Sequence, residues 1–181
     1  MKSPVSKFLT SKLAFIALVI WLGTNLFAQQ VPHTELTTLA NAHVIIPINP
    51  TVKPLLVMVG FSHKSSEDAA AWNKIYKFRY ETDPRLDYYE IADFEGVPSL
   101  IMKMILHGMR RSFQEPERSH FASFYEHEQG WKTLAGFDDP KITYLVLADK
   151  TGHVVWQIHG PATAAKAARL EKSVARLQAE H

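Results

Sequence analysis

The side chains best suited to catalysis lie in one short stretch, Phe61-Ser62-His63-Lys64-Ser65-Ser66-Glu67-Asp68. Ser65 or Ser66 would be a nucleophile if His63 acted as its base, which is hydrolase chemistry. A serine here can also cap a helix that begins at this point, and we favour that interpretation. No Gly-x-Ser-x-Gly elbow supports a hydrolase. We therefore predict no catalytic residue and take His63, Ser65, Ser66 and Asp68 as the candidate site loop.

Histidine is plentiful in this chain, which has nine of them. Imidazole is a good ligand for copper and zinc. The spacing of the histidines gives little support to a metal site, because His120 and His127 are seven positions apart and no His-x-x-x-His occurs. Folding could still bring His63 and His159 together at the ends of strands, which makes them the weak candidates for a metal site. We predict no cofactor.

Cysteine is absent from the whole sequence. Its absence excludes thiol–disulfide exchange, cysteine peroxidase chemistry, thiolate metal sites and iron–sulfur clusters. A domain of this size can be stable through apolar burial alone, so the fold does not need disulfides.

Two groups of side chains suggest contacts with a protein partner. Three methionines share one predicted helix, where thioethers could grip an apolar segment or simply fill the core: Met102, Met104 and Met109. Aromatic anchors supply large buried areas at interfaces, and four occur close together: Phe121, Phe124, Tyr125 and Trp131. These four could instead pack their own segment onto a sheet. We predict a protein partner, with a membrane complex as one option.

The N-terminus has the order of a secretory signal. Lys2, Lys7 and Lys12 precede the apolar run 13–27, and Ala28 follows as the expected cleavage residue. We predict that residues 1–28 are removed and that the protein is periplasmic or secreted; an uncleaved anchor, which would give membrane contact, is the alternative. Loss of the three lysines changes the net charge from +2 to −1, so nothing points to nucleic acid.

The first half of the chain predicts an extended segment and then alternating strands and helices. Residues 29–50 contain three prolines and favour extended structure, with an edge strand around His43 to Ile46. The apolar run Leu55 to Phe61 indicates a strand covered on both faces. A helix beginning at Ser65 or Ser66, a strand over Leu86 to Ala92 and a helix over Ser99 to Arg111 follow. A strand, a crossover helix and a strand imply a parallel pair.

The second half predicts an insertion, a hairpin and a final helix. Residues 112–140 are too long for a bare connection and should have structure of their own. The hairpin joins Ile142 to Ala148 with His153 to Ile158, and Thr163 can cap the last helix. We predict one α/β domain over residues 51–181, with the insertion between its second helix and the hairpin.

This order resembles the thioredoxin-like superfamily. The resemblance rests on Lys53 to Phe61 before the loop, on Asp139-Pro140 where the family has a cis proline, and on the hairpin and helix at the end. It implies a three-layer sandwich with a central mixed sheet. The family's Cys-x-x-Cys pair would fall at Ser66 and Ala69, or at Ser65 and Asp68, so the loop is a former active-site loop without its thiols.

Residues 144–163 are similar to the end of the ATP-ten type mitochondrial ATP synthase assembly factors, which are not, as a family, dithiol enzymes. The resemblance suggests help with a membrane complex. Together with the predicted signal and the absence of cysteine, it leads us to predict an exported, non-redox protein with a binding, assembly or chaperone-like function. Two alternatives stay open: an exported copper carrier, and a non-thiol enzyme with its site at the carboxyl ends of the strands.

Overall fold

The computed structural model describes residues 29–47, 53–126 and 128–179. The predicted signal over residues 1–28 lies outside the described residues. Within the described ranges, no helix has both the length and the apolar character needed to cross a membrane.

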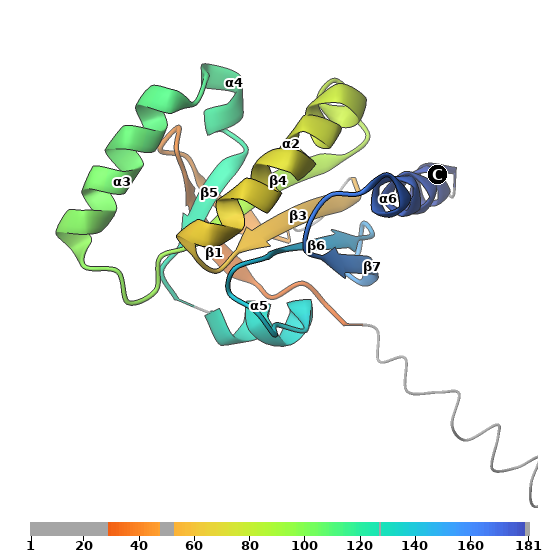
Figure 1. Ribbon diagram of the computed structural model, residues 1–181. Helices are drawn as coiled ribbons and strands as arrows, with labels where there is room; N and C mark the ends of the chain where they lie inside the picture. The colour runs from red at the N-terminus through yellow and green to blue at the C-terminus, as the bar shows by residue number, and fades with distance from the viewer. Residues whose placement is uncertain (1–28, 48–52, 127, 180–181) are drawn as a thin grey trace, which may run out of the picture.

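A single mixed sheet organises the chain (Figure 1). Its seven strands run in the order β2-β1-β5-β4-β3-β6-β7. Their bounds are β1 Thr34–Thr38, β2 His43–Ile46, β3 Leu55–Gly60, β4 Asp87–Asp93, β5 Phe121–Phe124, β6 Thr143–Ala148 and β7 Val154–His159. The pairs β3–β4 and β4–β5 are parallel, and the other neighbours are antiparallel.

The two most apolar strands lie side by side at the centre. Leu55 of β3 is in register with Ala148 of β6, and Gly60 is in register with Thr143. Every residue of β6 is buried, as are all residues of β3 except Gly60. This confirms the prediction that both runs are strands covered on two faces.

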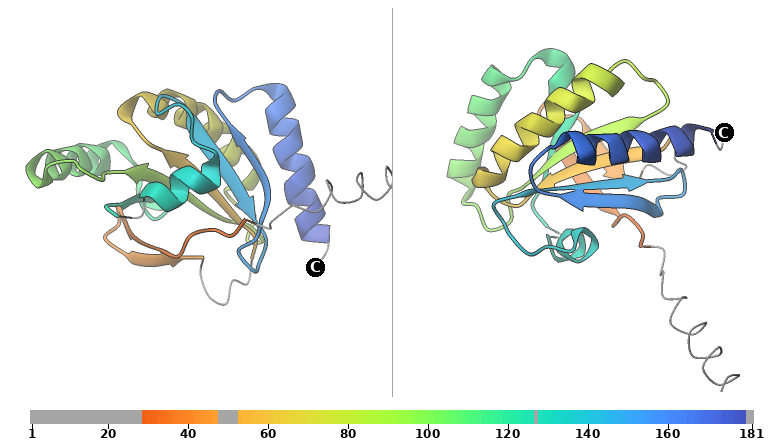
Figure 2. Two further views of the ribbon diagram at one scale, coloured as in Figure 1. Left: turned by 90° about the horizontal axis from the view of Figure 1, so that it is seen from below. Right: turned by 45° about the vertical axis from the view of Figure 1, so that its right-hand side comes forward.

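Helices cover both faces of the sheet, which gives three layers (Figure 2). Helices α2 (Ser66–Tyr80) and α6 (Ala164–Ala179) cover one face, where Trp72, Leu145 and Leu170 belong to one core cluster. Helix α5 (Glu128–Ala135) covers the other face, and its Trp131 packs with Val57 and Val146. The predicted three-layer α/β sandwich is confirmed.

Residues 112–140 contribute to the sheet itself. After α3 (Ser99–Ser112) and the short α4 (Glu115–Arg118), strand β5 enters between β1 and β4. Strands β1 and β2, from the segment before residue 51, extend the same sheet, and β2 forms its edge. The N-terminal segment and the insertion are therefore built into one sheet with the rest.

Burial corrects the prediction that the aromatic group forms a contact surface. Phe121, Phe124 and Trp131 are each at most 4% exposed, because β5 is an interior strand and α5 packs inward. Trp131 Nε1 also donates to Thr34 Oγ1 at 3.0 Å. These three residues pack onto the sheet, as the alternative interpretation predicts. Of the four, Tyr125 alone stays exposed.

The proline prediction is also wrong. Among the described residues, the cis peptide bond is Ile46–Pro47, and Asp139–Pro140 is trans. The turn before β6 is held instead by the hydroxyl of Tyr144, which accepts from the backbone N–H groups of Asp138 and Asp139 at 3.0 and 2.9 Å.

Candidate functional site

The serines of the candidate site loop are occupied by turn-forming hydrogen bonds. Ser62 Oγ donates to the carbonyl of Pro140 at 2.5 Å and accepts from the N–H of Lys64 at 3.2 Å, which caps the 3₁₀ turn η2 (His63–Ser65). Ser65 Oγ donates to the Ser62 carbonyl, and Ser66 Oγ donates to the His63 carbonyl, both at 2.7 Å. Ser65 occupies the N-cap position of α2, as predicted, but its hydroxyl makes no capping hydrogen bond, and the side chain that caps is Ser62, on the preceding short turn.

Ser65 joins the loop to the centre of the sheet. It is 2% exposed, and its carbonyl accepts from Thr143 Oγ1 at 2.8 Å. A Cβ placed on Gly60 would lie 2.6 Å from Ser65 Oγ, so the strand end approaches this side chain closely. A hydroxyl held this way is a structural contact and is not poised to attack a substrate.

We expect Ser65→Ala to lower the free energy of unfolding by about 1 kcal/mol, because it removes one buried hydrogen bond. Ser66→Ala, at an exposed neighbouring position, is the matched control and should change the free energy by less than about 0.5 kcal/mol. Urea unfolding followed by circular dichroism measures both. Equal losses in the two variants would contradict the role assigned to Ser65.

The two weak metal candidates do not form a recognisable site. His159 lies beside the ring of Tyr144, with centroids 5.6 Å apart, and its carbonyl accepts from Lys166 Nζ. Across the described parts of the chain, no three His, Asp or Glu side chains come together in a way that could hold a metal ion.

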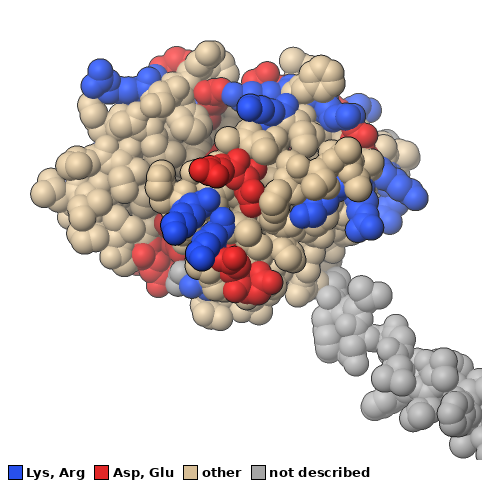
Figure 3. All heavy atoms as spheres, in the orientation of Figure 1, with Lys and Arg blue, Asp and Glu red and all other residues tan. Residues whose placement is uncertain are grey.

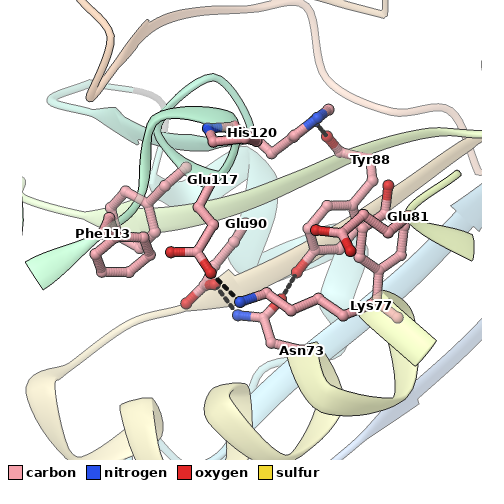
Figure 4. A pocket seen from close by; sticks show the side chains of 11 residues that line it. Asn73, Lys77, Glu81, Tyr88, Glu90, Phe113, Glu117 and His120 are labelled. Atoms are coloured by element: carbon pink, nitrogen blue, oxygen red, sulfur yellow. Dashed lines mark hydrogen bonds and ion pairs between the residues drawn. The ribbon is translucent and has the colours of Figure 1, made fainter.

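A cavity of about 130 Å³ lies between α2, α4 and strands β4 and β5 (Figure 4). Its polar side chains form two hydrogen-bonded groups. Tyr88 OH donates to Asn73 Oδ1, and Asn73 Nδ2 donates to Glu90 Oε2. Lys77 Nζ donates to Glu117 Oε1 across the cavity. The cavity thus holds one carboxylate, Glu117, in an ion pair and another, Glu90, fixed by an amide.

Burial shifts the pKa values of several ionisable groups that line this cavity. It raises the pKa of Glu90 to about 7, although the hydrogen bond from Asn73 and the charge of Lys77 act in the opposite direction. Burial likewise raises the pKa of Tyr76 to about 12 and that of Tyr88 well above its ordinary value. The hydrogen bond from Lys77 lowers the pKa of Glu117. Glu90 therefore changes charge near neutral pH.

Helix α3 carries the largest exposed apolar surface of the described residues. Leu100 is 74% exposed, Ile101 49%, Met104 70% and Ile105 39%. No residue of the helix is buried, although its sequence is amphipathic. Figure 1 shows α3 beyond the sheet, away from α6, and Figure 3 shows mostly uncharged surface over this end of the molecule. The alternative that its methionines fill the core is wrong.

Comparison with solved structures identifies the architecture. The exposed lipoprotein thioredoxin Etrx1 of Streptococcus pneumoniae aligns with a TM-score of 0.54 at 12% identity, covering 78% of this chain and 98% of its own. A putative electron transfer protein of Aquifex aeolicus aligns with a TM-score of 0.57 at 12% identity, covering 83% of this chain and 96% of its own. The fold is thioredoxin-like.

BsSco, a member of the Sco family of cytochrome c oxidase assembly proteins, shares this thioredoxin-like fold. Its TM-score is 0.56 at 8% identity, with 82% of this chain and 95% of its own covered. No family model and no curated protein matches the chain, so these comparisons give no support to the resemblance of residues 144–163 to ATP synthase assembly factors.

On the thioredoxin-like scaffold, the cavity around Glu90 and the apolar face of α3 lie away from the candidate site loop. The alternation over Leu86 to Ala92 predicts Glu90 on the same side of the strand as Leu86 and Tyr88, but it does not mark Glu90 as a site residue. An acid on the covered face of a strand was the available signal, because such a group needs a polar partner or a cavity. Nothing in the sequence placed Asn73, Lys77 and Glu117 around it.

Proposed function

We propose that this protein is an exported, thiol-independent binding module that holds a partner protein against the apolar face of α3 and serves in its assembly. The observation that carries the proposal is the exposure of Leu100, Ile101, Met104 and Ile105 on one helix. Exposed apolar clusters on soluble domains mark interaction sites, since their exposure to water is unfavourable.

Hydrogen bonds hold the C-terminal end of α3 in place, which suits a helix that binds a partner protein. Arg110 Nε donates to the carbonyl of Leu39 at 3.0 Å, and its Nη2 donates to Asn41 Oδ1 at 2.7 Å. Both acceptors lie in the turn between β1 and β2. The sheet edge therefore fixes the helix while its apolar face stays open.

The charges of α3 indicate the chemistry of the partner. The helix contains Lys103, His107, Arg110 and Arg111 and no Asp or Glu. Lys103, His107 and Arg111 are exposed. Opposite charges at the rim of an interface favour correct docking. We therefore expect an apolar surface on the partner, bordered by Asp or Glu.

Export and assembly are parts of the same proposal. Export is supported by the predicted signal, and the assembly role by the loss of the thiols from a scaffold that otherwise carries them in its active-site loop. The thioredoxin-like architecture is compatible with such a role, since BsSco belongs to a family of assembly proteins. We do not extend the proposal to ATP synthase.

A photo-crosslinking amino acid at position 104 tests the proposal in the native host. We expect one protein adduct of defined mass, which depends on the apolar face and is lost when Ile101→Asp and Ile105→Asp are added. The same amino acid at exposed Gln157 on β7 is the matched control and should give no adduct. Adducts at both positions, an adduct with lipid only, or no adduct at position 104 would each overturn the proposal.

The absence of cysteine leads to a separate expectation. Purified protein should reduce insulin and turn over peroxide no faster than buffer, because it has no thiol to oxidise. Measured activity in either assay would contradict the thiol-independent function.

A further inference from the structure

The cavity between α2, α4, β4 and β5 combines aromatic walls with carboxylates. Tyr76 and Tyr88 stack with ring centroids 3.8 Å apart, and Phe113 meets Phe121 edge to face at 5.2 Å. All four rings line the cavity, together with Pro116. A dry cavity of about 150 Å³ is large enough to hold benzene, so this one accommodates a compact molecule of similar or smaller size.

The charged groups around the cavity are predominantly acidic. Glu81, Glu90 and Glu117 line it, and Lys77 is the one Lys or Arg among its described lining residues. The ion pair with Glu117 neutralises Lys77. His120 is held by the carbonyl of Tyr88, 3.0 Å from Nδ1, so this nitrogen carries the proton. Ionised Glu90 would therefore give the cavity a net negative charge.

Glu90 is the group best placed to anchor a ligand. One of its oxygens accepts from Asn73, and no Lys or Arg of the described residues lies within ion-pair distance of its carboxylate. In Figure 4 its carboxylate faces the interior of the cavity, between Phe113 and Asn73. Lys77 lies near enough for its charge to act on Glu90 but is paired with Glu117, so this carboxylate has no ion-pair partner of its own, and aromatic rings beside it favour a cation.

We propose that this cavity binds a small organic cation, a primary or quaternary amine with a compact apolar body, whose charge pairs with Glu90. Aromatic rings and a carboxylate are the combination that recognises such ligands. The site goes beyond the proposed function, since it is separate from the apolar face of α3.

The proposal predicts a defined pH dependence. The ionisable groups that share the cavity with Glu90 are Tyr76, Lys77 and Glu81 from α2 and its end, Tyr88 from β4, Glu117 from α4, and His120 before β5. Burial keeps Glu90 partly protonated near neutral pH, and the cation requires the ionised form. With a pKa of about 7, affinity should rise about tenfold between pH 6 and pH 8, as the ionised fraction does.

Titration with tetramethylammonium chloride, followed by NMR shifts of residues around the cavity, tests the site at constant ionic strength. We expect saturable binding that tightens about tenfold from pH 6 to pH 8. We expect no saturable binding of tert-butanol, which is neutral and of similar shape. Glu90→Gln should lose binding of the cation by at least about tenfold, while Glu67→Gln, outside the cavity, keeps it.

Several outcomes would overturn the proposal. They are an absence of saturable binding to the wild-type protein, an affinity that does not change with pH, and equal binding by the Glu90→Gln variant. Because the pH profile is measured on the wild-type protein, the test does not depend on the folding of any variant. The NMR titration is also independent of the crosslinking experiment at α3, so failure of one proposal does not imply failure of the other.

Discussion

Trp131→Ala is expected to lower the free energy of unfolding by about 3 to 5 kcal/mol, the usual cost of truncating a fully buried tryptophan. Trp131 is 0% exposed and belongs to the core cluster between α5 and the sheet. Truncation opens a cavity there and removes the donor to Thr34 Oγ1. Urea unfolding of residues 29–181, monitored by circular dichroism and near-ultraviolet absorbance, measures the loss.

Two further variants distinguish the loss of packing around Trp131 from the general effect of removing a tryptophan. Trp131→Phe keeps most of the apolar volume and loses the hydrogen bond, so its cost should be intermediate. Trp156→Ala, on edge strand β7, truncates a side chain that is only partly buried and should cost less than Trp131→Ala. If Trp131→Ala were no more destabilising than Trp156→Ala, the packing of α5 on the sheet would be wrong.

The central strands and the crossover helix could be predicted because their signals are local. The run Leu55 to Phe61 is continuously apolar, and the alternation from Leu86 to Ala92 correctly separates Tyr88 and Glu90 from Tyr89 and Ile91. The turn Asp149 to Gly152 contains an Asp side chain that accepts from Thr151 N, as a turn-forming Asp does. Such patterns involve neighbouring residues only and do not depend on residues that are distant in sequence.

The interior position of β5 could not be predicted, because four residues carry too little pattern. Phe121 to Phe124 are all buried, and their strand pairs with β1 and β4, which are distant in sequence. The exposure of α3 has a similar origin. Its apolar residues have helical spacing whether a core or a partner covers them, so periodicity alone does not distinguish the two.

The cavity around Glu90 depends on contacts between segments that are separate in sequence. Asn73 is on α2, Glu90 on β4, and Glu117 on α4. The sequence shows an acid in an apolar strand, but the amide and the ion pair beside it follow from the topology. A sequence motif cannot predict such a site, because a motif consists of residues at fixed spacing.

Glu90→Gln is expected to make the protein about 3 kcal/mol more stable at pH 8, since each unit of pKa shift corresponds to about 1.4 kcal/mol. The pKa of Glu90 rises from 4.5 to about 7 because burial penalises its charged form. At pH 8 the wild-type protein must hold that charge in the cavity. Glutamine is neutral at every pH, and its amide oxygen can still accept from Asn73.

The sign of the pH dependence follows from proton binding. Between pH 4.5 and 7 the folded protein binds more protons at Glu90 than the unfolded chain does, so the free energy of unfolding falls as the pH rises through this window. Glu117 has a lowered pKa, so its contribution is lost only at more acidic pH. Urea unfolding at pH 4.5, 6, 7 and 8 should give a shallower slope for Glu90→Gln than for the wild type. The exposed control Glu67→Gln should keep the wild-type slope, and parallel curves for all three proteins would mean that Glu90 titrates as an ordinary carboxyl group.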